Sequence, residues 1–184
     1  MSRVGRGVVY FNRSNGKGMR RSITNHERES LLATFYRPHH RALEEITARA
    51  LNGRGSALIV DAHSFPDLPW RVEPCQDLER PDFCLGSDPF HTPPPLLEIA
   101  EAFLAQGGFS VAVNRPYAGT LVPSRYYQKN KHVLGVMIEV NRRLYMNEET
   151  GAKNSRFPEI ASAIQSLGLL LRDWHAGRGS RILP

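Results

Sequence analysis

The sequence has little cysteine and no long hydrophobic run. Cys75 and Cys84 are its two cysteines in 184 residues, too few for a disulfide framework. Both lie in one Pro- and Asp-rich stretch, where we expect two free thiols, with a single bridge as the alternative. No apolar run is long enough to span a bilayer, and the N-terminus lacks the apolar core of a secretory signal. We therefore expect a cytoplasmic protein.

Acidic residues are absent from the first 26 positions, and the net charge of the chain is +6. Such an excess can mark a nucleic-acid-binding surface, but no zinc finger, RNP pattern or helix-turn-helix signature accompanies it. We interpret it as a solvated arm or as arginines that recognise a small anionic substrate. A basic nucleic-acid-binding module is the alternative. The basic residues before Glu27 are Arg3, Arg6, Arg13, Lys17, Arg20 and Arg21.

The composition, with 41% hydrophobic and 23% charged residues, is ordinary for a globular protein, and the length suggests one domain over residues 1–184. Helical and strand patterns alternate, which predicts an α/β domain with helices covering a mixed sheet. The predicted elements are a strand at 7–11 with a turn after it, a helix at 25–52 in two pieces, with Pro38 either breaking the helix or starting the second piece, a strand at 56–62, an irregular stretch at 64–91, a helix at 92–106, strands at 109–114 and 132–141, and a helix at 158–174.

Three details of this pattern are specific enough to check. Asn25 is expected to cap the first helix. The continuous apolar run at 56–62 predicts a strand that is buried on both faces. Apolar residues at helical spacing predict two inward-facing stripes in the first helical region, made of Leu31, Leu32 and Phe35 and then of Leu43, Ile46 and Ala50.

Polar residues stand at the ends of three predicted strands, where open α/β sheets bind ligands. Asp61 and His63 are two residues apart, so on a strand they share a face, and the carboxylate can fix the tautomer of the histidine. Ser64 points away from His63, which disfavours a Ser-His dyad. The other two strand ends carry Asn114, Arg115 and Tyr117, and Glu139, Asn141 and Arg142.

Glu139 interrupts an otherwise apolar strand. Such an acid is costly unless it is paired, bound to a metal or used in chemistry. A structural ion pair with Arg142 or Arg143 is one interpretation. We favour a second, in which Glu139 is a general base beside a metal-bound water.

Several stretches, taken together and in this order, resemble the N-formylglutamate amidohydrolase family. They are "DAHSFP", "NRPYAGTLVPSRYY" and "VMIEVNRRLYMNE", with "YRPHHRAL" and "RPDFCLGSD" as intervening segments. The resemblance extends from about Gly5 to Trp174, and "IEVNRRLYM" is its most specific part. It implies a three-layer α/β/α fold around a mixed sheet, similar to zinc carboxypeptidases and of the phosphorylase/hydrolase-like type.

The resemblance also implies a reaction, the hydrolysis of N-formyl-L-glutamate or a related N-acyl amino acid, which ends one histidine-degradation route. It implies a zinc ion held by His63, with Asp61 as the partner that orients this ligand. It makes Glu139 the general base. It places four residues around the substrate: Asn114, Arg115, Tyr117 and Arg142.

This sequence departs from the family pattern in two places. Arg115 stands where the family often has a small or polar residue. The family also has an upstream segment with a "PHxG"-like stretch and a later acid that look like further zinc ligands, and the resemblance here begins after it. We therefore expect an N-terminally truncated member or a fragment of a longer reading frame. A catalytically inactive homologue without a complete zinc site is the alternative function.

Overall fold

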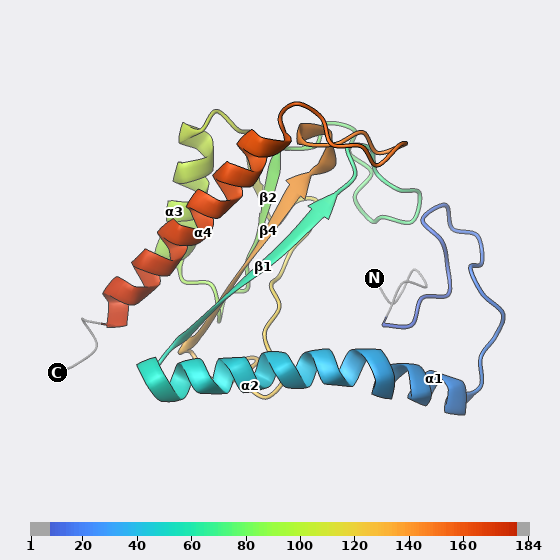
Figure 1. Cartoon of the computed structure of the whole chain (residues 1–184), viewed down its shortest axis with the longest axis horizontal. Coiled ribbons are helices and arrows are strands. Elements are labelled where there is room, and N and C mark those ends of the chain that lie inside the picture. The colour runs from blue at the N-terminus through green and yellow to red at the C-terminus, as the bar shows by residue number, and fades with distance from the viewer. Residues whose placement is uncertain (1–7, 180–184) are drawn as a thin grey trace.

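The computed structural model describes residues 8–179, which form an α/β domain (Figure 1). None of the helices in this range is long and apolar enough to cross a membrane. The elements are α1 (Asn25–Leu31), the π-helical turn η2 (Leu32–Tyr36), α2 (Arg37–Arg54), β1 (Ala57–Phe65), β2 (Phe83–Gly86), α3 (Pro94–Gln106), β3 (Val111–Val113), β4 (Val133–Asn141), the 3₁₀ turn η3 (Arg142–Leu144) and α4 (Phe157–Gly179).

The four strands form one mixed sheet in the order β1-β4-β2-β3. β1 runs parallel to β4, and β2 runs antiparallel to β4 and parallel to β3. The predicted α/β class and mixed sheet are therefore confirmed. β2 lies inside the stretch predicted to be irregular. The strand was not predicted because four residues among prolines are too few to give a strand pattern.

β4 is the central strand of the site, and all of its residues are buried. The prediction that the run at 56–62 is buried on both faces is wrong, because within the described chain β1 is an edge strand whose Val60 is 39% exposed. Ala57 and Phe65 at the ends of β1 are buried, whereas the residues between them are partly or fully exposed.

One face of the sheet packs against α3 and α4, and this contact forms the hydrophobic core (Figure 1). The helices contribute their apolar stripes because leucines and alanines recur at helical spacing. The core residues are Phe83, Leu85, Leu96, Ala100, Leu104, Leu134, Val136, Ile138, Val140, Leu144, Ile160, Leu167 and Leu171.

The opposite face is covered by irregular chain and then by α2. Gly86 and Gly135 let this chain approach closely, since an added Cβ would lie 2.3 Å from the Gly119 carbonyl oxygen and 2.9 Å from Thr120 Cγ2, respectively. In Figure 1, α2 lies beyond this segment, on the side of the sheet away from α3 and α4. The three layers are thus helices, sheet and helix, as the resemblance implied.

The first helical region differs from its prediction in its cap. Thr24 caps α1, and its hydroxyl and the Glu27 carboxylate form a reciprocal capping box. The chain then stays helical through η2 into α2, because Pro38 lies in the first turn of α2, where a missing N–H is tolerated. The predicted cap at Asn25 is therefore wrong, whereas the prediction that Pro38 starts a second helical piece is confirmed by the start of α2 at Arg37.

The predicted inward stripes of this region are mostly wrong. Leu32 is buried, but Leu31, Phe35 and Ile46 are 39%, 69% and 55% exposed. Phe35 lies inside the π-helical turn, where α-helical spacing from Leu31 and Leu32 does not hold, whereas the exposure of Leu31, before the turn, and of Ile46, within α2, has no such explanation.

The predicted strand at 7–11 is also absent. Residue 7 lies outside the described residues, and residues 8–11 form no strand. A single antiparallel bridge between Asn12 and Gly18 is present around the predicted turn.

Candidate active site

The site lies where β1 and β4 end, and strand register brings its side chains together. His63 is the register partner of Glu139 on the neighbouring strand β4, and Cys84 of β2 is the partner of Glu139 on its other side. Register partners in adjacent strands point to the same face of a sheet. His63 and Glu139, which are far apart in sequence, are therefore neighbours on the face away from α3 and α4.

His63 and Asp61 form the pair that their spacing predicted. His63 Nε2 lies 2.8 Å from Asp61 Oδ1. If Nε2 donates to the carboxylate, Nδ1 carries the lone pair of the neutral ring and is the nitrogen that can accept a proton or bind a ligand. The His63 side chain is 52% exposed, whereas that of Asp61 is 16% exposed. The histidine is thus held by a mostly buried carboxylate while its own ring is open to solvent.

Glu139 is 8% exposed, and burial raises the pKa of its carboxyl to about 7. His63, when it is protonated, and Arg142 act in the opposite direction, and Asp61 adds to the rise. Its Oε2 atom is buried and has no hydrogen-bond partner within the described chain. A carboxyl whose pKa lies near neutrality and whose oxygen is unpaired is suited to accept a proton from a bound water.

Segment 66–82 connects the end of β1 to the start of β2 and forms one wall of the site. Because β4 lies between these two strands, the segment crosses the carboxyl end of β4. Arg80 fixes this crossing, since its guanidinium pairs with Glu73 and donates to the carbonyl oxygen of Pro66 at 3.1 Å. The Arg80 and Glu73 side chains are 1% and 2% exposed. The wall over Glu139 is therefore held by a buried ion pair.

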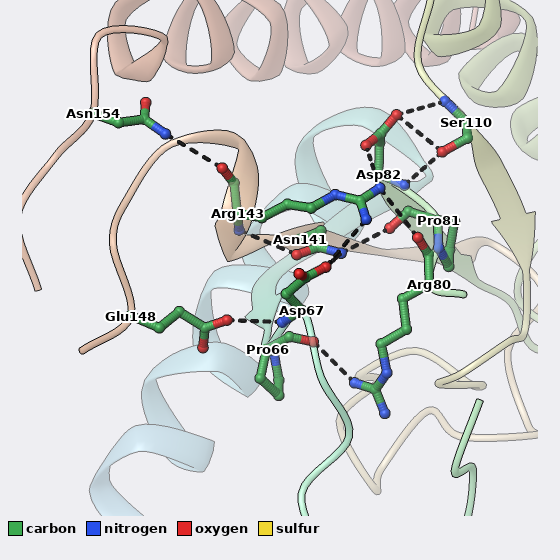
Figure 2. A network of polar contacts seen from close by, with 10 residues as sticks. All are labelled: Pro66, Asp67, Arg80, Pro81, Asp82, Ser110, Asn141, Arg143, Glu148 and Asn154. Carbon is green, nitrogen blue, oxygen red and sulfur yellow. Dashed lines mark hydrogen bonds and ion pairs between the residues drawn. The ribbon is translucent and has the colours of Figure 1, made fainter. Parts of the chain in front are cut away.

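A second network fixes the ends of the wall to β4 and η3 (Figure 2). Arg143 donates to Asp67 at 3.1 Å, to Asp82 at 2.9 Å and to the Arg80 carbonyl oxygen at 3.2 Å. Asp82 in turn accepts from the backbone N–H and the hydroxyl of Ser110, both at 2.9 Å. These contacts join segment 66–82, the end of β4 and the start of β3 into one rigid edge.

The contacts of this edge were not predicted from the sequence. "RPDFCLGSD" contains Arg80, but its local pattern does not mark the arginine as buried. Glu73, Arg143 and Glu148 lie in polar stretches that also suit a solvated surface, so only long-range contacts distinguish them.

The predicted substrate residues differ in their places and contacts. Because β3 runs antiparallel to β4, Asn114 at the end of β3 lies away from the carboxyl end of β4, whereas Arg115 reaches segment 66–82. The Asn114 amide binds Ser87, donating to its hydroxyl at 2.8 Å and accepting from its backbone N–H at 2.9 Å. Arg115 is mostly exposed and pairs with Asp77. Both lie in a turn that contains a cis Arg115–Pro116 bond. Their role in substrate binding stays a prediction.

Tyr117 and Arg142 are less exposed than Asn114 and Arg115. The Tyr117 ring packs 5.8 Å from that of Phe65, and burial, together with a hydrogen bond to Glu73, raises the pKa of its hydroxyl. Arg142 is close enough to Glu139 to act on its pKa. The two cysteines are free: Cys84 is buried, its thiol donates to the Tyr117 carbonyl oxygen at 3.2 Å, and burial raises its pKa.

The implied zinc ion can be tested against the side chains present. A catalytic zinc ion needs about three protein ligands and an open position. Across residues 8–179, no group of three or more histidine, cysteine, aspartate or glutamate side chains is arranged to hold a metal ion. His63 therefore lacks the companions of a complete zinc site within this range, and the donors of this range alone do not fit the implied ion.

The fold and the site together define an α/β protein with a buried carboxyl group at the carboxyl ends of parallel strands. The model of the N-formylglutamate amidohydrolase family matches residues 1–146. The chain therefore belongs to the N-formylglutamate amidohydrolase family, as its motifs implied.

Individual relatives agree with this assignment. The chain is 32% identical over 125 residues to the N-formylglutamate deformylase of Pseudomonas aeruginosa, covering 67% of this chain and 46% of that protein. It is 30% identical over 124 residues to the N-formylglutamate deformylase of Pseudomonas putida, covering 66% and 45%. The chain thus spans about half the length of the curated relatives it matches.

Solved structures show the same fold. The crystal structure of N-formylglutamate amidohydrolase from Ralstonia eutropha matches with a TM-score of 0.82 and 26% identity, covering 95% of this chain and 63% of that one. A gene product of Agrobacterium tumefaciens matches with a TM-score of 0.59 and 21% identity, covering 83% and 55%, and shows the fold alone.

Proposed function

We propose that this chain acts as an amidohydrolase on N-formyl-L-glutamate or a related N-acyl amino acid, releasing formate and the free amino acid. Family membership and the names of the relatives support the substrate class. The single observation that carries the reaction type is Glu139, a buried carboxyl with a pKa of about 7 and one oxygen atom without a partner in the described chain.

Glu139 acts as the general base in this proposal. Its carboxylate takes a proton from a water molecule as the water oxygen bonds to the formyl carbon. The tetrahedral intermediate then collapses with cleavage of the C–N bond, and Glu139 returns the proton to the amine nitrogen. A base with a pKa near the working pH combines a useful deprotonated fraction with a sufficient affinity for the proton.

The Asp61–His63 pair supplies the neighbouring electrophilic group. When protonated on both nitrogens, the ring is held by Asp61 through Nε2 and presents the Nδ1–H to ligand. A zinc ion at His63 is part of the proposal only as a prediction from the resemblance, and its remaining donors would have to lie outside residues 8–179. The cytoplasmic location and the role in histidine degradation likewise stay predictions.

The test is formate release from N-formyl-L-glutamate by wild-type protein and by Glu139→Gln. Loss of a general base lowers the rate by about 10²- to 10⁴-fold. Glu98→Gln, an exposed glutamate on α3, is the matched control and should leave the rate unchanged. If Glu139→Gln releases formate at the wild-type rate, Glu139 is not the general base.

A second candidate is a homologue that keeps the fold and binds the ligand without turnover. The lack of a three-donor metal site within the described chain favours it. Elemental analysis of the purified protein separates the two candidates: zinc at one equivalent per chain rejects the inactive homologue, and metal-free protein with no formate release supports it.

A further inference from the structure

Arginines at the site edge are already neutralised by acids of the same chain. An anionic substrate can bind one of them only by competing with its internal partner, so the strength of each pair decides which arginine is accessible. The four pairs are Arg80 with Glu73, Arg115 with Asp77, Arg142 with Glu148, and Arg143 with Asp67 and Asp82.

Two of these arginines are unsuitable as ligand sites. Arg80 is almost completely buried, and its pair with Glu73 holds the wall of the site. Arg143 is fixed by two carboxylates and a carbonyl oxygen (Figure 2). Arg115 is 70% exposed and is held by Asp77.

Arg142 differs in position and in the weakness of its acidic contact. Its guanidinium is held in place by Ser64, through the hydroxyl and the carbonyl oxygen, both at 3.1 Å, and it lies 5.5 Å from the centre of the Trp70 ring. Its contact with Glu148 is long, 3.4 Å, and its side chain is 23% exposed. It is also close enough to Glu139 to lower the pKa of that carboxyl. Arg142 is thus oriented and partly accessible.

Glu148 is the weak partner in this pair. It lies in the turn enclosed by the bridge between Met146 and Lys153, and its side chain is 31% exposed. One of its oxygens accepts from the Asp67 backbone N–H at 2.8 Å, and the other makes the long contact with Arg142. The carboxylate is tethered through one oxygen, so the other can give way without release of the turn.

We propose that Glu148 is an internal competitor at an anion subsite formed by Arg142, and that a carboxylate of the ligand displaces it. Glu148 thereby sets the affinity for dicarboxylates. Its carboxylate neutralises Arg142 in the free protein, and only a ligand with a well-placed carboxylate takes the place of Glu148 on Arg142. The inference rests on the proposed function for the identity of the substrate, but the subsite itself can be tested without turnover.

The experiment measures dissociation constants by calorimetry for glutarate, which has two carboxylates and no amide, and for N-formyl-L-glutamate. Glu148→Gln keeps an oxygen that can accept from the Asp67 N–H but removes the charge. We expect it to tighten binding of both ligands by about 2- to 5-fold, the range for a partly exposed ion pair. Glu149→Gln removes the same charge one residue away and should change neither constant.

The Arg142→Gln background isolates the pair. If Glu148 acts through Arg142, Glu148→Gln has no effect on binding once Arg142 is replaced. An equal gain in both backgrounds, no gain in the wild-type background, or no glutarate binding by either wild type or Glu148→Gln overturns the proposal. Glutarate binding that responds as expected without formate release from N-formyl-L-glutamate supports the subsite and refutes the proposed reaction instead.

Discussion

Glu139→Gln should stabilise the protein at alkaline pH and leave its stability unchanged at acidic pH. The raised pKa means that the folded state binds the Glu139 proton more tightly than the unfolded state does. Below pH of about 4.5 both states are protonated, and no destabilisation arises. As the pH rises from 4.5 to about 7, Glu139 loses its proton in the unfolded state but keeps it in the folded state. Ionisation lowers the free energy of the unfolded state, so the wild type loses stability.

The magnitude follows from the shift. A rise from 4.5 to about 7 corresponds to up to about 3 kcal/mol at 1.36 kcal/mol for each pKa unit, and screening at the partly open edge reduces this toward about 2 kcal/mol. Glutamine cannot ionise and does not carry this cost. Urea unfolding at pH 4, 6 and 8 should therefore give Glu139→Gln an advantage over wild type that grows to about 2 to 3 kcal/mol at pH 8.

The matched control is Glu98→Gln on the exposed face of α3, for which the difference from wild type should stay small at all three pH values. Parallel stability curves for wild type and Glu139→Gln would refute the reasoning, because they would mean that Glu139 titrates alike in the folded and unfolded states. This test needs no catalytic activity, so it examines burial of the acid independently of the proposed reaction.

Two further predictions concern the wall and the covered face of the sheet. Arg80→Met leaves the Glu73 charge buried without its partner and should lower the free energy of unfolding, measured in urea, by about 3 to 5 kcal/mol. The double variant that also carries Glu73→Leu should recover most of this loss. Equal losses in the single and double variants would contradict the prediction. Gly86→Ala places a Cβ 2.3 Å from a backbone carbonyl oxygen and should lower the free energy of unfolding by about 1 to 3 kcal/mol. Gly53→Ala, in open space on α2, should leave the stability unchanged or raise it by up to about 1 kcal/mol. Thermal unfolding in which Gly53→Ala is the less stable variant would contradict this prediction.

The parts of the site that were predicted correctly are those with a local signature. Glu139 interrupts an apolar strand, so its burial could be inferred from its immediate neighbours. Asp61 and His63 are two residues apart on a strand, so the ion pair between them follows from the alternation of side chains. The motifs around these residues also identified the family that the comparisons confirm.

The parts that were missed depend on distant contacts or on a change of helical period. The pair of Arg142 with Glu148 joins a strand end to a separate turn, and no local pattern distinguishes Glu148 from its exposed neighbour Glu149. The exposure of Phe35 follows from the π-helical turn, which α-helical spacing does not anticipate. β2 is stabilised by pairing on both sides and needs no long apolar run of its own.

The crossing of segment 66–82 over the end of β4 has a consequence for the direction in which a ligand arrives. Because that segment closes one side, the approach that residues 8–179 leave open is along the β1 edge, where His63 is 52% exposed and Glu139 behind it is 8% exposed. An incoming molecule therefore meets the histidine before the glutamate. For the proposed reaction, this geometry predicts that the small acyl end enters first and reaches the buried carboxyl, while the amino-acid part trails toward solvent. Variation in that trailing part should be tolerated more readily than enlargement of the acyl group.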